Sequence, residues 1–167
     1  MTSRERVLTS LDHREPDGRP VDLGSNPSSG ISAVAHANLV RHLGLADQRT
    51  RVYDVVQQLA QPSDELIDRL RIDAVDIGRT FNTRDADWKP LALPVGIETE
   101  IPAWFDPVRQ EDGALEAFTA DGLRIAAMPK GAAFFDQTYF PYLDGYPDDL
   151  SNLPQVMPLV LWSGLVH

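Results

Sequence analysis

The sequence has no cysteine, and only two of its 15 basic residues are lysines, against 25 acidic residues. The absence of cysteine excludes disulfides, thiolate nucleophiles and cysteine-ligated zinc. A net charge of −10 without clustered basic residues argues against nucleic-acid and anionic-membrane partners. The N-terminus lacks an apolar signal-peptide core, and the apolar run at 157–166 is shorter than the ~20 residues that span a bilayer. We therefore expect a cytoplasmic protein without nucleic-acid or membrane partners.

The first 45 residues predict two helices around one short strand. Thr2 and Glu5 form a capping-box pattern, which begins a helix that ends near His13. The apolar stretch at 20–24 predicts a strand, and a second helix is expected from Ser29 to Leu43, ending at Gly44. The residues expected on the buried face of this second helix are Ile31, Val34, Ala35 and Leu39.

Residues 51–78 predict a helix that Pro62 interrupts, followed by a second strand. Proline lacks an amide donor, so the helix stops there and a new one begins, with Leu66, Ile67 and Leu70 facing inward. The β-prone stretch at 72–78 then predicts a strand that is covered on both faces. Strand, helices and strand together indicate a parallel βαβ crossover in an α/β protein.

Residues 88–130 lack helical periodicity and predict an antiparallel β insertion. Asp121-Gly122 is a hairpin signal between two short apolar stretches. An aromatic cluster follows between Phe134 and Tyr146, and a last helix is expected at about 147–157. The cluster is interpreted as a hydrophobic lid over the sheet ends; the alternative is that it covers a flat ligand.

Two carboxylates are candidates for catalysis because of their places at the ends of the predicted strands. Asp22 ends the first strand and Asp76 the second, and neighbouring parallel strands lie only ~5 Å apart. Two close carboxylates push their pKa values apart, which suits acid/base work. The alternative is structural: Asp22 caps the serine-rich loop, and Asp76 bonds backbone amides.

Polar residues near these strand ends are candidates for substrate binding. Ser25, Asn26 and Ser29 could present hydroxyls and amides to an anionic group; the alternative is that Ser29 caps the second helix. Arg79 could meet a substrate carboxylate, as could Arg84, and surface pairing with Asp85 or Asp87 is the alternative. The spacing of the histidines gives no metal site, because the six residues from His36 to His42 turn a helix by about 240° beyond one full turn, so the two side chains do not share a face.

Several motifs together resemble the N-terminal half of the uroporphyrinogen decarboxylase superfamily. They are "RVLTSLDHREPDGRPVDLG", "RVYDVVQQLAQP", "IDAVDIGR", "DWKP" and "MPKGAAFFDQTYFP", and they extend over most of the chain. The superfamily contains the decarboxylase of porphyrin biosynthesis and cobamide-dependent methyltransferases. The resemblance implies a (β/α)₈ TIM barrel with its pocket at the carboxyl ends of the strands.

The departures from the family pattern favour its methyltransferase branch. Decarboxylases carry an arginine-bearing stretch after the first strand, whereas this chain reads "LGSNPSSGIS" there. A methyltransferase-like member acting on a small methylated substrate or corrinoid is therefore expected, with the decarboxylase as the alternative. In methyltransferases the zinc ligands lie in the C-terminal half, so corrinoid or zinc would belong to a full-length parent.

The length predicts an incomplete barrel. A (β/α)₈ barrel takes ~250 residues, so residues 1–167 are expected to form an N-terminal portion, inactive alone, with about two parallel strands and the 88–130 insertion. Open strand edges and an apolar tail would drive association, either as a homo-oligomer or with the missing C-terminal half. A rival interpretation from another class is a noncatalytic interaction piece that a partner completes.

Overall fold

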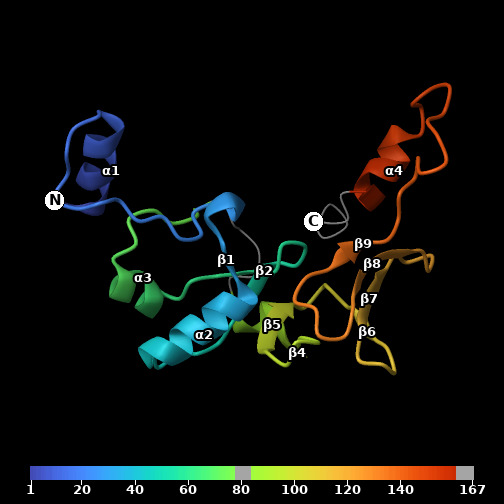
Figure 1. Ribbon diagram of the computed structural model, residues 1–167, viewed down its shortest axis with the longest axis horizontal. Helices are drawn as coiled ribbons and strands as arrows, with labels where there is room; N and C mark the ends of the chain where they lie inside the picture. The colour runs from blue at the N-terminus through green and yellow to red at the C-terminus, as the bar shows by residue number, and fades with distance from the viewer. Residues whose placement is uncertain (78–83, 161–167) are drawn as a thin grey trace.

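The computed structural model describes residues 1–77 and 84–160, and its elements extend between two helices at opposite ends (Figure 1). The helices are α1 (Ser3–Leu11), α2 (Ala33–Leu43), α3 (Asp64–Leu70) and α4 (Leu153–Val160), with single 3₁₀ turns at Pro27–Ser29 and Asp85–Asp87. The strands are β1 (Ile31–Ser32), β2 (Val52–Asp54), β3 (Leu59–Ala60), β4 (Trp88–Ala92), β5 (Glu98–Pro102), β6 (Val108–Arg109), β7 (Leu115–Phe118), β8 (Arg124–Met128) and β9 (Asp136–Gln137).

The expected parallel TIM-barrel portion is wrong for the part of the chain that the structure describes. Its three sheets, β1-β3-β2, β4-β5 and β6-β7-β8-β9, are antiparallel throughout. The two stretches predicted as parallel strands meet only at one isolated parallel bridge, between Asp22 and Ala74. Val75 and Ile77 stay exposed beyond that bridge, so the cover on both faces that a parallel strand needs is missing.

Residues 51–62 also depart from the prediction. They form the β2–β3 hairpin instead of a helix, with a turn in which Gln58 adopts a left-handed φ of 53°. Val52, Tyr53 and Leu59 are β-branched, aromatic or branched apolar residues that suit a buried hairpin. Pro62 ends the segment as expected, and α3 begins after the Ser63 cap with Leu66 buried, which confirms the second helical piece.

The predicted helix ends are confirmed more fully than the predicted faces. Thr2 and Glu5 form the capping box of α1, and Gly44 ends α2 at a left-handed φ of 64°. The start of α2 was wrong by four residues, because Ser32 and not Ser29 is its cap. Its buried face was also wrong: the buried residues are Ala33, His36, Ala37 and Val40.

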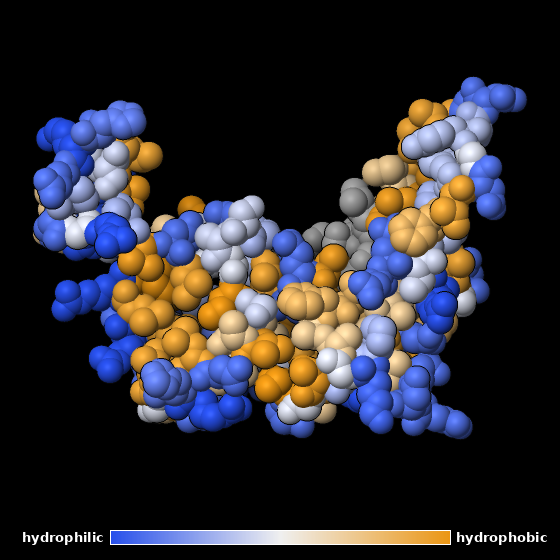
Figure 2. Space-filling model, viewed as in Figure 1, coloured by the Kyte–Doolittle hydropathy of each residue, from blue (hydrophilic) through white to orange (hydrophobic). Residues whose placement is uncertain are grey.

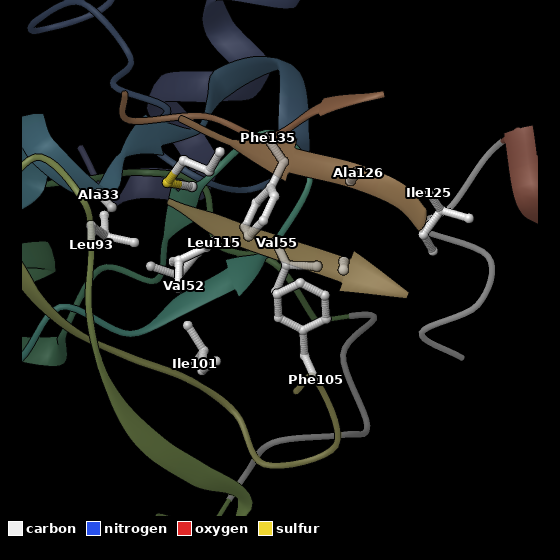
Figure 3. Packing of buried hydrophobic residues seen from close by; sticks show 12 residues of the cluster. Ala33, Val52, Val55, Leu93, Ile101, Phe105, Leu115, Ile125, Ala126 and Phe135 are labelled. Carbon is white, nitrogen blue, oxygen red and sulfur yellow. The ribbon is translucent and has the colours of Figure 1, made fainter. Parts of the chain in front are cut away.

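The main hydrophobic core forms where the sheets and the start of α2 converge (Figure 3). Leu115 of β7 and Met128 of β8 are fully buried, together with Ile101 of β5. The expected Asp121-Gly122 hairpin joins β7 to β8, and Gly122 takes the positive φ of 87° that this turn requires. These antiparallel sheets supply the core and are not an insertion into a parallel sheet.

The two end helices contribute little to this core. None of the residues of α1 and α4, all of which the structure describes, is buried. In the space-filling view they stand up at either end of a broad, hollowed surface with apolar groups between them (Figure 2). The described residues include no helix that is long and apolar enough to cross a bilayer.

Candidate functional site

Asp22 organises the loop that leads from the first predicted strand to α2. Its Oδ1 accepts hydrogen bonds from the Ser25 amide at 3.1 Å and the Ser29 hydroxyl at 2.9 Å, and its Oδ2 accepts from the Ser25 hydroxyl at 2.6 Å. Burial raises the pKa of Asp22, but the hydrogen bonds from Ser25 and Ser29 outweigh it and hold this pKa below its ordinary value. These bonds are the ones that the capping alternative predicts, and they keep the carboxylate ionised.

Asn26 and two glycines fix the path of the same loop. The Asn26 side chain accepts from the Ser28 amide at 2.9 Å, and the Gly24 amide donates to the Ser29 carbonyl at 3.0 Å. Gly24 has a φ of 91°, and a Cβ on Gly30 would lie 2.6 Å from a Leu59 methyl. The loop therefore lies against β3 with a shape that the glycines alone allow.

The structure does not favour the interpretation that this loop binds an anion, because a carboxylate of the same loop occupies its hydroxyl donors. The hydroxyls of Ser25 and Ser29, which could have met an external anion, both donate to Asp22.

The cap of α2 is Ser32, since the α2 amide of Ala35 donates to Ser32 Oγ at 3.3 Å. Ser32 directly precedes the apolar helix pattern, a signal that could have identified it as the cap.

An isolated parallel bridge joins Asp22 to Ala74, in the segment that also contains Asp76. The Asp73 amide donates to the Val21 carbonyl at 2.7 Å next to this bridge. Asp76 follows Ala74, the bridge partner of Asp22, by two residues. Asp76 is half-buried, and Arg79 lies outside the described residues.

Asp73 is a structural residue of this edge that the sequence analysis missed. Its carboxylate accepts from the Val21 amide at 2.9 Å and pairs with the Arg6 guanidinium of α1. Its side chain is only 1% exposed, and the hydrogen bond from Val21, assisted by Arg6, lowers its pKa. Asp73 is a charged residue inside a mostly apolar, β-prone stretch, and this was the signal that could have found it.

Other candidate groups have ordinary structural partners. Arg84 pairs with Asp87 at 2.7 Å, as its surface alternative predicts. His36 is buried, with Nδ1 3.1 Å from Thr50 Oγ1. No group of three or more His, Asp or Glu side chains within residues 1–77 and 84–160 is arranged to hold a metal ion.

No protein-family model matches the chain, and searches of curated proteins and of solved structures found no similar protein. The resemblance to the uroporphyrinogen decarboxylase superfamily therefore rests on the sequence motifs and stays a prediction.

Proposed function

We propose that the chain contributes a small-molecule site to an enzyme of the uroporphyrinogen decarboxylase superfamily, of the methyltransferase-like kind. The observation that carries this proposal is the parallel bridge between Asp22 and Ala74. It supports a shared site because it joins the end of the first predicted strand to the second, two residues before Asp76.

The hydrogen bonds of Asp22 favour a binding role over proton transfer. A carboxylate whose pKa is held low by Ser25 and Ser29 stays ionised near neutral pH and accepts hydrogen bonds. Together with Asp76 and the net charge of −10, it favours cationic or uncharged methylated compounds over polycarboxylates.

Amide NMR of the whole chain tests the proposal. Trimethylammonium chloride, methanol and uroporphyrin are titrated separately, and we expect the first two to shift amide signals of residues 22–30 and 73–77. The Asp22→Asn variant should weaken that response. Asp54→Asn is the matched control, because Asp54 also accepts backbone amides of its own turn, from Val56 at 3.0 Å and Gln57 at 2.8 Å.

Shifts at these positions caused by uroporphyrin alone would favour the decarboxylase alternative. If the Asp22→Asn and Asp54→Asn variants respond equally to the small molecules, Asp22 is not part of their binding site.

The second candidate function is a noncatalytic interaction piece, which the exposed apolar side chains beside the bridge favour. Ile77 is 93% exposed, Val75 is exposed next to it, and Leu11 of α1 is also exposed. A partner strand could cover the open edge of this segment. Sedimentation distinguishes the two functions, since a monodisperse complex without a response to the small molecules supports the interaction piece.

A further inference from the structure

Residues 140–160, which we call the aromatic arm, keep their apolar side chains in solvent. The sequence predicts a lid here, but the residues of the aromatic cluster that pack on the main core are Phe135 and the partly buried Tyr139, and both precede the arm. Leu143 is 78% exposed and Tyr146 is 85% exposed, and Phe140 and Leu150 are also exposed. Large apolar side chains gathered on one exposed segment are typical of an interaction site.

The aromatic arm is held in shape by its own contacts. The Tyr142 hydroxyl donates to Asn152 Oδ1 at 2.8 Å, which ties the turn to the start of α4. The rings of Tyr142 and Tyr146 lie 5.6 Å apart, and the Leu143 amide donates to the Phe140 carbonyl at 3.2 Å. Because these contacts exist before binding, less conformational entropy is lost when a partner covers the arm.

The charge around these apolar groups has one sign. From Gly131 to Val160 the sequence has four aspartates and neither lysine nor arginine. Three of the aspartates, Asp144, Asp148 and Asp149, are exposed in the arm. Hydrogen bonds from Ser151 lower the pKa of Asp149, so this carboxylate stays charged near neutral pH.

This charge selects among the possible occupants of the surface. A second copy would bring an equally acidic arm and a further charge of −10, so like charges would meet. We propose that the aromatic arm docks a basic amphipathic segment of a partner protein, whose apolar face covers Leu143 and Tyr146 and whose lysines or arginines face the aspartates. Apolar anchors with complementary charges at the rim are the usual composition of such an interface.

Fluorescence anisotropy with defined peptides tests this docking surface on the full chain. The probe is a labelled helical peptide of about 14 residues, four helical turns, with leucines on one face and lysines on the other. The comparison peptide has glutamate in place of every lysine. We expect the lysine peptide to bind with an affinity that falls as salt is raised, and the glutamate peptide not to bind.

Variants with matched controls locate the binding. Asp148→Asn with Asp149→Asn should weaken binding of the lysine peptide by roughly tenfold. The control is Glu111→Gln with Asp112→Asn, which removes the same charge from an exposed turn where Asp112 caps Ala114 as Asp149 caps Ser151. Tyr146→Ser should also weaken binding, whereas Val108→Ser, at an exposed apolar residue of β6, should not.

Equal binding by the arm variants and their controls would overturn the proposal, because attraction to the net charge would then explain the affinity. A dimer in sedimentation that Leu143→Ser dissolves would overturn it in favour of a second copy.

Discussion

The sheets from β2 to β9 bury their apolar side chains, whereas the two end helices leave theirs accessible to solvent. In the sheets, Ile101, Leu115 and Met128 from three strands meet in one core and are almost fully buried. In α1 and α4, apolar side chains are present but none is buried. An apolar face becomes a core only when a second layer covers it, and the antiparallel sheets supply that layer locally.

The largest expected effect is the loss of a core side chain from β7. Leu115→Ala leaves a cavity among fully buried neighbours, so the free energy of unfolding should fall by about 3 kcal/mol, within the usual range for buried leucines. Urea denaturation followed by circular dichroism measures it. The matched control is Leu11→Ala in α1, where the change should stay within about 0.5 kcal/mol because this leucine is exposed. Equal losses would show that α1 is packed in solution.

A smaller effect is expected at Arg51, which connects β2 to the β4–β5 hairpin. Its guanidinium lies 2.7 Å from Glu100 and 2.5 Å from Asp85, and 5.4 Å from the centre of the Trp88 ring. Arg51→Met should lower the free energy of unfolding by about 1.5 kcal/mol, because Glu100 loses a charged hydrogen-bond donor.

Arg124→Met is the control for Arg51, since the pair of Arg124 with Glu116 is more exposed and should contribute less than about 0.5 kcal/mol. Urea denaturation of both variants measures the difference. An equal effect at the two positions would show that burial and the Trp88 contact add nothing.

The pH dependence of unfolding should depend on His36 of α2. Burial lowers the pKa of His36 despite the nearby Asp47, so the folded protein resists a proton that the unfolded chain binds. Stability should be constant above about pH 6.5, the ordinary histidine value, and fall as the pH drops below it. His36→Gln should flatten the curve between pH 7 and 5, whereas His42→Gln, at an exposed position, should leave it unchanged.

The smallest effect is a local release of α1 in acid. Arg6, and then the N-terminal amine, lower the pKa of Asp17 to about 2, and the bond from Val21 lowers that of Asp73. The stabilisation by these carboxylates is present above pH 4 and is lost as the pH falls through the lowered values. As the pH falls, the amides of α1 should lose their protection against hydrogen exchange at a higher pH than the amides of β7 and β8. Arg6→Gln should produce the same release at neutral pH. If α1, β7 and β8 lose their amide protection together, α1 is not held separately from the sheets.

Local signals were enough for the ends of several elements. Thr2 with Glu5, and Gly44, act through hydrogen bonds or backbone angles within a few residues, so their sequence neighbours define them. The β7–β8 hairpin was predictable for the same reason. Residues 51–60 were not, because their apolar pattern suits a helix or a hairpin, and pairing with β1 selects the hairpin.

The candidate site was predictable in part. The sequence indicated that Asp22 could cap its loop, and Ser25 and Ser29 do donate to it. Asp73 joins α1 to this edge through Arg6, and this partner could not be predicted because the two residues lie 67 positions apart. Long-range ion pairs depend on how the intervening chain folds, and no local pattern records that.

By itself, the sequence determined the negative charge, the capping box of α1, the end of α2 at Gly44 and the Asp121-Gly122 turn, because each follows from residue type and nearest neighbours. Only the tertiary structure decided that the described sheets are antiparallel, that Asp22 meets Ala74 at a single bridge, and that the aromatic arm stays uncovered. Strand pairing and burial depend on contacts between distant residues, and these form only where two apolar faces can cover each other.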